Sequence, residues 1–289
     1  MIKYYLKIKW VKKTCAIPSW GGAFSDFIAV LNLFSREKQF ERSDELELNK
    51  IYNEDCLEGM KHIPDGSVDM ILCDLPYGTT RNKWDSILPL DLLWEQYNRV
   101  IKERGAIILT AQTPFDKVLG MSNLKMLKYE WVWEKEAGTG FLNAKKMPLK
   151  NHENILVFYK KLPVYNPQMR LGFKPYIAKK GNHGSNYGED KGAITKSDGS
   201  RYPLTVVNFA RDKDKLHPTQ KPVALFEYLI KTYTNKGETV LDNCMGSGTT
   251  AIACLNTNRN YIGFELDKEY FNIANERIDK HKRDIAKDN

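Results

Sequence analysis

From residue 50 onward, short apolar runs alternate along the chain with longer segments whose apolar residues recur at helical spacing. The run AIILTA, residues 106–111, is apolar throughout, which predicts a strand covered on both faces. Segment 89–103 has helical spacing, and Gly105 stands where such a helix would end. By the same criteria we expect strands at 50–56, 67–74, 106–111, 128–135, 153–160, 238–243 and 260–266, and helices at 57–63, 89–103, 113–122, 222–234, 248–257 and 267–284.

Strands that alternate with helices predict an α/β fold with a doubly wound, mostly parallel, Rossmann-like sheet. Ligands of such sheets bind beyond the carboxyl ends of the strands. The rhythm breaks at residues 161–216, which we interpret as an insertion between one α/β segment at 49–160 and a second at 217–289. Residues 1–48 do not follow the pattern and are predicted to be an N-terminal extension, whose role the sequence leaves open.

The chain has 289 residues and a formal net charge of +8. Its positive charge is concentrated in the window 160–221, which holds thirteen Lys or Arg and five Asp or Glu. Aromatic residues such as Tyr176 and Tyr202 are interspersed in this window. A solvated basic loop would carry the same charge, but a basic, aromatic and glycine-containing insertion favours nucleic-acid binding.

The five cysteines include no CxxC pair, which argues against a disulfide framework and a zinc site and fits a reducing cytoplasm. The basic and apolar N-terminus is interrupted by Asp26 and lacks a small-residue cleavage site, so no signal peptide is predicted. No stretch reaches the roughly 18 apolar residues of a membrane span. We therefore expect a soluble, cytoplasmic protein with no metal centre and no membrane partner.

A glycine-containing turn follows the predicted strand at 238–243 and opens the next helix. A nucleoside triphosphate is disfavoured because no Lys follows the last glycine, and a dinucleotide is disfavoured because Gly246–Thr250 lacks the third glycine of GxGxxG. S-adenosylmethionine is the remaining ligand, with its carboxylate against the turn. Glu265 ends the next strand, where a carboxylate can accept both ribose hydroxyls.

A second turn, Asp74-Leu75-Pro76-Tyr77, follows the strand at 67–74 and lies at the same edge of the predicted sheet. The exocyclic amine of a nucleobase is a poor nucleophile because its lone pair is conjugated into the ring. Asp74 and the Leu75 carbonyl could accept its two hydrogens and so favour the tetrahedral geometry that frees the lone pair. Pro76 restricts Leu75 to an extended conformation, and Tyr77 offers a ring on which a flipped base can stack.

These motifs resemble those of the amino-methylating DNA methyltransferases, which act on adenine N6 or cytosine N4, in their β-class order. In that family an [Asp/Asn/Ser]-Pro-Pro-[Tyr/Phe] motif comes first, the target-recognition region second and the cofactor motif third. Here Asp74–Tyr77, the basic window and Asp242–Thr250 follow that order. HPTQKP at 217–222, Asp55 in NEDC and the stretch HENILVF match further family segments, so the resemblance covers roughly residues 50–280.

The resemblance implies a catalytic half at 49–160, a target-recognition insertion at 161–216 and a cofactor-binding half at 217–289. It implies a site-specific DNA methyltransferase that flips its target base, uses S-adenosylmethionine and needs neither a metal nor a covalent intermediate. The catalytic residues would be Asp74, Leu75, Pro76 and Tyr77. The cofactor-binding residues would be Asp55, Cys56, His217, Thr219, Gln220, Lys221, Asp242, Asn243, Cys244, Gly246, Ser247, Gly248, Thr249, Thr250, Glu265 and Leu266.

Two turns depart from the family pattern. Leu75 replaces the usual first proline, which leaves the backbone carbonyl in place, and Asn243 and Cys244 stand where the family commonly has Pro and Phe. Members with Asp at the first catalytic position are mostly adenine enzymes, so the resemblance favours adenine N6, with cytosine N4 as the alternative. Cytosine C5 chemistry is excluded because no Pro-Cys pair occurs, and Cys73 is expected to be a core residue.

DNA is the expected macromolecular partner, and seven side chains are predicted to contact it: Trp84, Asn143, Lys145, Lys146, Arg201, Lys213 and Lys215. A homodimer and a cognate restriction endonuclease are further partners that the family suggests and the sequence leaves open. So are the recognition sequence and the preference for single- or double-stranded DNA. A third hypothesis is a non-catalytic DNA-binding protein with a relict cofactor site, which the joint presence of Asp74, Tyr77 and Gly246–Thr250 disfavours.

Overall fold

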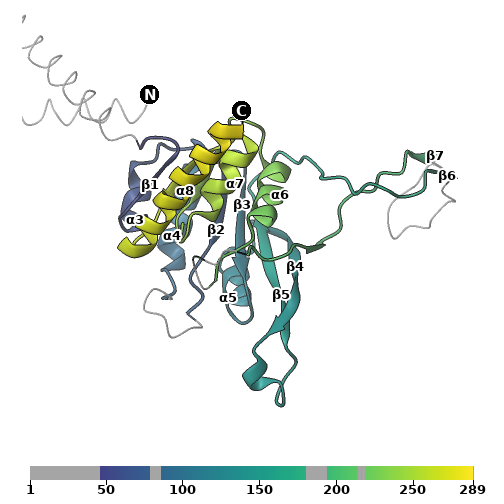
Figure 1. The fold of residues 1–289 in the computed structure, drawn as a ribbon, viewed down its shortest axis with the longest axis horizontal. Helices are drawn as coiled ribbons and strands as arrows, with labels where there is room; N and C mark the ends of the chain where they lie inside the picture. The colour runs from purple at the N-terminus through teal and green to yellow at the C-terminus, as the bar shows by residue number, and fades with distance from the viewer. Residues whose placement is uncertain (1–45, 79–85, 180–193, 214–215, 217–218, 289) are drawn as a thin grey trace, which may run out of the picture. The chain divides into compact units, whose positions relative to one another are not determined.

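The computed structural model describes residues 46–78, 86–179, 194–213, 216 and 219–288. Its main sheet has the strand order β1-β10-β9-β2-β3-β5-β4-β8 (Figure 1). The strands are β1 (Lys50–Tyr52), β2 (Val68–Asp74), β3 (Ile101–Ala111), β4 (Leu127–Thr139), β5 (Lys150–Phe158), β8 (Val206–Asn208), β9 (Thr239–Asp242) and β10 (Asn260–Phe264). Among these strands only β5 pairs antiparallel with its neighbours, which confirms the mostly parallel sheet.

Helices cover both faces of the sheet. They are α3 (Cys56–Gly59), α4 (Leu90–Val100), α5 (Phe115–Ser122), α6 (Val223–Tyr233), α7 (Thr249–Thr257) and α8 (Lys268–Asp288), with short 3-10 turns η1 (Met60–His62) and η2 (Phe141–Asn143). Successive residues of β2 point to opposite faces: Leu72 joins the core beneath α6, α7 and α8, whereas Ile71 and Cys73 join the core beneath α3, α4 and α5. Cys73 is fully buried, so the expectation that it is a core residue is confirmed.

Strands β9 and β2 lie side by side at the point where the strand order reverses. From β9 the chain crosses through α7 to β10 on one side, and from β2 it crosses through α4 to β3 on the other. The register pairs Met70 with Val240 and Ile71 with Leu241, so the turns that follow Asp74 and Asp242 leave the sheet at the same edge. Ligands of doubly wound sheets bind at such a reversal point.

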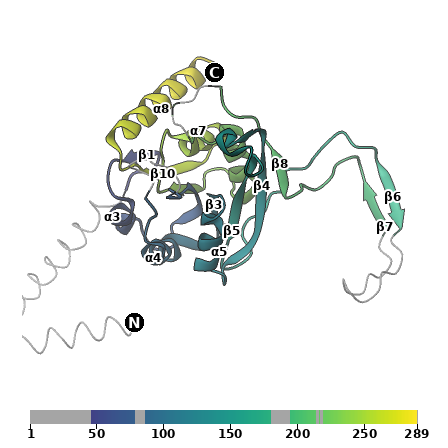
Figure 2. The same cartoon turned by 90° about the horizontal axis from the view of Figure 1, so that it is seen from below.

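Two parts of the chain reach beyond this α/β body. The β4–β5 hairpin continues past the end of β3, because Ala111 pairs with Asn154 while the paired part of the hairpin extends further, to Thr139 and Lys150 (Figures 1 and 2). Strands β6 (Tyr176–Lys179) and β7 (Ile194–Ser197) form a separate two-stranded sheet, which lies apart from the main sheet in both views. Strand β8, from the end of the predicted insertion, pairs with β4 at the edge of the main sheet.

The prediction that a helix continues to Gly105 is wrong. Helix α4 ends at Val100, and Ile101 is already extended and begins β3. Gly105 lies inside this strand, where an added Cβ would stand 2.7 Å from the Ile101 side chain and 2.8 Å from the Asp69 carbonyl. The glycine is therefore needed for close packing within the sheet, a role that helical spacing in the sequence does not distinguish from a helix end.

Candidate active site

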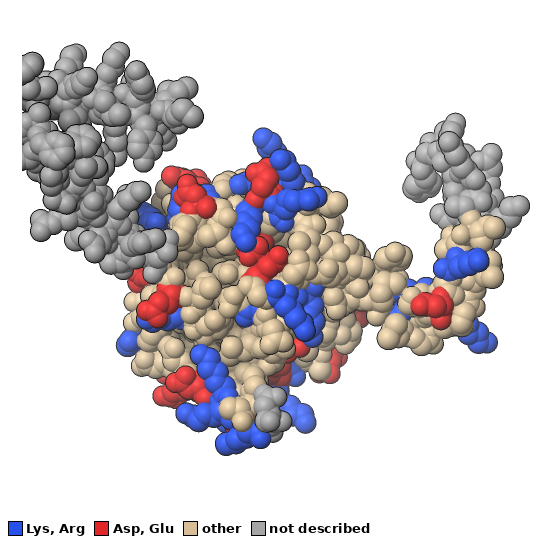
Figure 3. All heavy atoms as spheres, turned by 90° about the horizontal axis from the view of Figure 1, so that it is seen from above, with Lys and Arg blue, Asp and Glu red and all other residues tan. Residues whose placement is uncertain are grey.

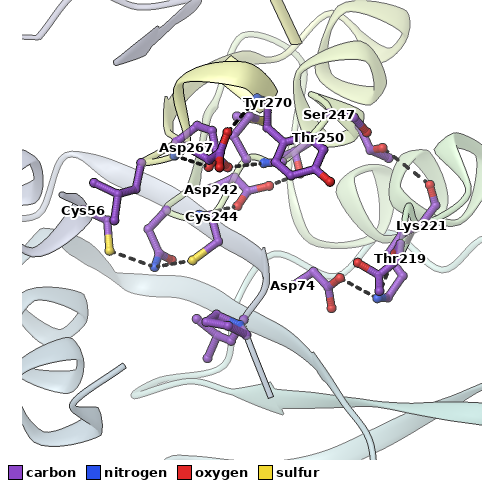
Figure 4. A pocket seen from close by; sticks show the side chains of 18 of the residues that line it. Cys56, Asp74, Thr219, Lys221, Asp242, Cys244, Ser247, Thr250, Asp267 and Tyr270 are labelled. Atoms are coloured by element: carbon purple, nitrogen blue, oxygen red, sulfur yellow. Dashed lines mark hydrogen bonds and ion pairs between the residues drawn. The ribbon is translucent and has the colours of Figure 1, made fainter. Parts of the chain in front are cut away.

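A cavity of about 590 Å³ lies at the carboxyl ends of β2, β9 and β10 (Figure 4). This volume falls within the range of roughly 300–1,000 Å³ that is usual for small-molecule sites. The four predicted catalytic residues, Asp74–Tyr77, line it together with the turn after Asp242, the end of β10 and residues 219–221. The structure thus brings both motif turns into one site.

The carboxylate of Asp74 is held by three side-chain donors. Its Oδ1 accepts hydrogen bonds from the hydroxyl of Tyr77, at 2.6 Å, and from that of Thr110 on β3. Its Oδ2 accepts from Nζ of Lys221, at 2.5 Å. Because a carboxylate can accept about four hydrogen bonds, Oδ2 keeps room for one further donor. The Asp74 side chain is 23% exposed, so such a donor can come from the cavity.

Tyr77 is fixed at both ends. Its hydroxyl bonds Asp74 and lies 3.0 Å from the Thr110 hydroxyl, and its ring stacks on Phe115 with 5.4 Å between the ring centroids. Burial, followed by the charge of Asp74, raises the pKa of the Tyr77 phenol, so it acts as a hydrogen-bond donor at neutral pH. Leu75 is buried in the core beneath α4 and α5.

Lys221 belongs to a buried chain of alternating charges. Only 5% of its side chain is exposed; its Nζ contacts Asp74 on one side and lies 3.3 Å from Oε2 of Glu153 on the other. Lys135 pairs with Oε1 of the same glutamate. Burial alone would lower the pKa of Lys221, but the charges of Asp74 and Glu153 raise it. The ammonium therefore stays protonated beside Asp74.

Glu153 has one oxygen that is not satisfied by a hydrogen bond. Oε2 is buried and, although it lies within ion-pair distance of Lys221, the geometry of that contact is not that of a hydrogen bond. The two neighbouring lysines, Lys221 and Lys135, lower the pKa of Glu153 against the effect of its burial. The ion pair with Lys221 is thus electrostatic and not directional, which leaves N–H capacity on the ammonium.

The glycine turn is built around Asp242. Its carboxylate is buried and accepts from the backbone N–H of Cys244, at 3.0 Å, and from the Thr250 hydroxyl at the start of α7. Burial raises the pKa of Asp242 to about 6, although these two bonds act in the opposite direction. Asp242 therefore ties the turn to the helix as a structural support.

Glu265 links the turn to the loop after β10. Its Oε2 accepts from the N–H of Gly246, at 2.7 Å, and its Oε1 from that of Asp267, at 2.8 Å. Each oxygen keeps further acceptor capacity toward the cavity that Glu265 lines, and burial raises the pKa of the carboxyl. Gly246 has a φ of +53° and no described atom within 4 Å of the Cβ that it lacks. A turn with open space above it and a carboxylate beside it fits S-adenosylmethionine, the ligand that the sequence predicts.

Asn243 and Cys244, which depart from the family pattern, point toward the core of the turn. The amide oxygen of Asn243 accepts from the buried Tyr97 hydroxyl, at 2.5 Å, and its amide nitrogen lies 3.6 Å from the sulfur of Cys56. Both residues still line the cavity. In this chain a polar bond to α4 supports the turn where the family commonly has proline.

Most of the predicted cofactor residues line the same cavity. Gly248 does not line it: its φ is +82° and α8 packs against it, with Ala274 3.3 Å from the missing Cβ. His217 lies outside the described residues. The others all line the cavity: Asp55, Cys56, Thr219, Gln220, Lys221, Asp242, Asn243, Cys244, Gly246, Ser247, Thr249, Thr250, Glu265 and Leu266.

The predicted DNA contacts that the structure describes lie in three parts of the chain. Asn143, Lys145 and Lys146 are exposed at the tip of the β4–β5 hairpin, and Lys213 is exposed in the segment before residue 216. The guanidinium of Arg201 is bound within the β6–β7 region, where it donates to the Lys174 carbonyl and lies 4.6 Å from the Tyr176 ring. Trp84 and Lys215 lie outside the described residues.

Charge on the molecular surface is mixed. On the face drawn in Figure 3, Lys and Arg side chains lie between Asp and Glu side chains over the body and along the β6–β7 ribbon, so the described residues form no continuous basic patch there. Groups of His, Cys, Asp and Glu that could hold a metal ion are likewise absent from the part of the chain that the structure describes. Within the same residues, no helix is long and apolar enough to cross a membrane.

Sequence reasoning missed several polar residues of the site. The motifs do not point to Glu153, Thr110 or Lys135, although Glu153 stands in the stretch HENILVF, and they assign Lys221 to the cofactor alone. These residues come from three strands and a loop and meet only in the folded protein. The one signal in the sequence is Glu153 itself, an acid two positions before the apolar run 155–158.

The chain is similar to known DNA methyltransferases. The model of a DNA methylase family, N6_N4_Mtase, matches residues 68–276. The type II methyltransferase M.BglII of Bacillus subtilis is 33% identical over 78% of this chain and 68% of its own length. The DNA adenine methyltransferase YhdJ of Escherichia coli K12 is 31% identical over 81% of this chain and 83% of its own length.

Solved structures show the same fold. M1.HpyAVI in complex with SAM has a TM-score of 0.54 at 26% identity, over 79% of this chain and 98% of its own. The cytosine-N4-specific PvuII DNA methyltransferase has a TM-score of 0.60 over 82% of this chain and 92% of its own, but only 15% identity, so this likeness concerns the fold alone.

Proposed function

The chain belongs to the N6/N4 DNA methylase family, and within that family we propose that it is a site-specific methyltransferase acting on adenine N6. The observation that supports the reaction most directly is the meeting of Asp74, the last residue of β2, with the glycine turn after β9 in one cavity. That arrangement places an acceptor for an amine beside a site for a methyl donor.

The cofactor is S-adenosylmethionine, which supplies an electrophilic methyl group on sulfur when bound. We assign the ribose hydroxyls to Glu265 and the amino acid end to the turn at Gly246 and the start of α7, where the partial positive charge of the helix favours a carboxylate. Asp55 caps α3 by accepting from the N–H of Leu57, at 2.7 Å, and lines the cavity at the end proposed for the adenine.

For the amine, the free acceptor position on Oδ2 of Asp74 is the central group. An amine hydrogen accepted there, and a second one accepted by the Leu75 carbonyl, would localise the nitrogen lone pair. Asp74 is held in one orientation by Tyr77, Thr110 and Lys221, so little reorganisation is needed during the reaction. The N–C bond would form as the S–CH3 bond of the sulfonium breaks, which leaves a neutral thioether and a positively charged nitrogen. The Asp74 carboxylate stabilises this charge, and its Oδ2, which already accepts from the amine, can take the proton that the nitrogen then loses.

Tyr77 would carry the flipped base on the ring face opposite Phe115. One face is already covered, with 5.4 Å between the ring centroids, and the hydroxyl is bonded to Asp74, so the ring cannot turn away. Stacking of a base on such a fixed ring contributes roughly 1–3 kcal/mol. This stacking offsets part of the energy needed to take the base out of the duplex.

DNA is proposed to lie across the carboxyl edge of the sheet and to contact the β4–β5 hairpin. Its tip presents Lys145 and Lys146 next to the exposed Phe141 and Leu142, beyond the end of β3. Lysine contacts to phosphates would make binding strongly dependent on salt. The guanidinium of Arg201 already donates hydrogen bonds within the β6–β7 region. We therefore propose that Arg201 stabilises the structure of that region and does not contact DNA.

Adenine is preferred over cytosine because of Asp74 and the likeness to the adenine methyltransferase YhdJ. The test is to map methylated bases in DNA from cells that express the protein, with cells expressing Asp74→Ala as control. N6-methyladenine at one sequence motif, absent from the control, is the expected result. N4-methylcytosine in its place would overturn the choice of base, and an unmethylated genome would overturn the proposed activity.

A further inference from the structure

Asp74 and Lys221 place a hydrogen-bond acceptor and a hydrogen-bond donor side by side at the edge of the cavity. The Oδ2 of Asp74 and the Nζ of Lys221 are 2.5 Å apart, and both residues line the cavity (Figure 4). Oδ2 keeps one acceptor position, as described above. The other contacts of the ammonium are long: 3.3 Å to Glu153 and 3.5 Å to the Thr219 carbonyl. An N–H of Lys221 can therefore turn to a ligand without losing a short hydrogen bond.

Such an ordered pair is complementary to a particular edge of a nucleobase. Adenine and cytosine present an amine, which donates, beside a ring nitrogen, which accepts. Guanine and thymine present a carbonyl oxygen beside a ring N–H at the corresponding positions. A carboxylate followed by an ammonium therefore matches the first two bases at both positions and is mismatched to the other two at both.

We propose that the ammonium of Lys221 donates a hydrogen bond to the ring nitrogen next to the target amine, N1 of adenine, while Asp74 accepts from the amine. This inference rests on the proposed function. It makes Lys221 a residue that determines base specificity, in addition to any contact with the cofactor. A flipped base is commonly read by hydrogen bonds to this edge, and a buried polar residue left without its partner disfavours the wrong base.

Glu153 and Lys135 hold Lys221 in place from behind. Glu153 lies between the two lysines, is 7% exposed, and is positioned by the start of β5, whereas Lys135 comes from β4. The four charges of Asp74, Lys221, Glu153 and Lys135 sum to zero, so the pair that faces the base carries no uncompensated buried charge. Because the contact between Lys221 and Glu153 is not a directional hydrogen bond, the ammonium can turn to the base within this frame.

The experiment combines a change in the protein with a change in the base. Once the recognition motif is mapped, duplexes are prepared with adenine, 1-deazaadenine or 7-deazaadenine at the target position. The first analogue lacks N1, and the second is a control that lacks N7, the ring nitrogen on the other side of the amine. Methyl transfer by the full chain is measured for wild type, Lys221→Met and Lys231→Met. Lys231 is a partly exposed lysine on the following helix, α6, where it pairs with Glu227.

For wild type and Lys231→Met, kcat/KM is expected to fall about 10- to 100-fold on 1-deazaadenine relative to adenine, as for the loss of a hydrogen bond to a charged donor. For Lys221→Met, which is slower on adenine, the same analogue is expected to cause less than about a threefold further loss. Both proteins should respond alike to 7-deazaadenine. Equal losses on 1-deazaadenine in wild type and Lys221→Met would overturn the inference.

Two further variants protect this test against misfolding. The double variant Glu153→Gln/Lys221→Met keeps the net charge of the buried group, and Lys221→Arg keeps the cation but moves its donors. On 1-deazaadenine the double variant should show the same small further loss of kcat/KM as Lys221→Met. Lys221→Arg should show part of the loss seen for wild type. If the genome carries N4-methylcytosine, the adenine assignment fails, and the same comparison with 3-deazacytosine tests Lys221 independently. If wild type methylates neither base, both proposals fail.

Discussion

Asp74 and Asp242 end neighbouring parallel strands and face the same cavity, yet their surroundings differ in kind. Asp74 is partly exposed and meets a cation, Lys221, and two hydroxyls. Asp242 is buried and accepts from the backbone N–H of Cys244 and from the Thr250 hydroxyl, neither of which is a cation. We therefore propose that the same residue type at equivalent places serves chemistry in one turn and architecture in the other.

The difference lies in the partners and not in the strands. A carboxylate beside an ammonium, with an acceptor position toward the cavity, can respond to a substrate. A carboxylate whose oxygens bond the chain that follows it fixes that chain. We expect changes at the two positions to separate accordingly: Asp74 should affect methyl transfer, and Asp242 should affect stability and cofactor binding.

The largest expected effect is that of Asp74→Ala on methyl transfer. Loss of the amine acceptor should lower kcat by about 10²–10⁴-fold, the range usual for a group that handles a proton in the transition state. The affinity for S-adenosylmethionine should change by less than about threefold, because the glycine turn and Glu265 do not contact this carboxylate through any described bond. Transfer of a radiolabelled methyl group and calorimetric binding measure the two quantities. A kcat within tenfold of wild type would contradict the catalytic role of Asp74.

The matching change in the other turn is Asp242→Ala. It leaves the N–H of Cys244 and the Thr250 hydroxyl without their acceptor in a buried place, so we expect the free energy of unfolding to fall by about 2–4 kcal/mol. Urea denaturation measures this loss. Binding of S-adenosylmethionine should weaken at least tenfold as the turn loosens. Unchanged stability would show that Asp242 is not the support of the turn.

The pH dependence of stability offers a third contrast, because burial raises the pKa of Asp242 to about 6 from 3.8. The native state thus holds this proton to a higher pH than the unfolded state does. The stabilisation is present in full below pH 3.8 and is lost as pH rises through 6, a decrease of about 3 kcal/mol.

This contribution is isolated by comparing wild type with Asp242→Asn, which keeps the shape of the side chain and has no proton to lose. The difference in free energy of unfolding between the two should shift by about 2 kcal/mol between pH 4.5 and 7, in favour of Asn at the higher pH. Glu265, whose pKa is also raised, titrates in both proteins and cancels in the difference. A difference that does not vary with pH would show that Asp242 is not protonated in this range.

The sequence predicted both turns well because each is contiguous. Asp74–Tyr77 and Gly246–Thr250 are short motifs at strand ends, and parallel strands bring their carboxyl ends to one edge, so their meeting in one cavity follows from the strand pattern. The contacts that distinguish the two aspartates could not be predicted in this way. Lys221 reaches Asp74 from 147 positions away along the chain, and Glu153 is placed by the register of an antiparallel strand.

The order of the elements was predictable, but not every boundary. The helical spacing of residues 89–103 runs past the end of α4 at Val100 and into β3. Over so short a range, Ile101 fits the spacing of a helix as well as that of a strand. Likewise, β8 was hidden in the basic insertion, where Val206–Asn208 is too short to be distinguished from a loop. Pairing with β4 decides its structure.

The smallest expected effect is that of Leu75→Pro, which installs the residue that the family commonly has after the catalytic Asp. The proposed reaction needs the backbone carbonyl of residue 75 and not its side chain, so kcat should stay within about threefold of wild type. The Leu75 side chain is nevertheless buried, 3% exposed, and its loss should lower the free energy of unfolding by about 1–2 kcal/mol.

Leu75→Pro therefore reverses the pattern of Asp74→Ala, with chemistry retained and stability reduced, and it resembles a change at Asp242 although it lies one residue from Asp74. Methyl transfer and urea denaturation on the same preparation measure both effects. If kcat collapsed while folding and cofactor binding stayed intact, the Leu75 carbonyl could not be the second acceptor of the amine. Proline changes the backbone at residue 75 and leaves Asp74 and its three partners in place. Such a loss would therefore show that the reaction depends on the backbone conformation at residue 75 and not on the Asp74 carboxylate and a carbonyl alone.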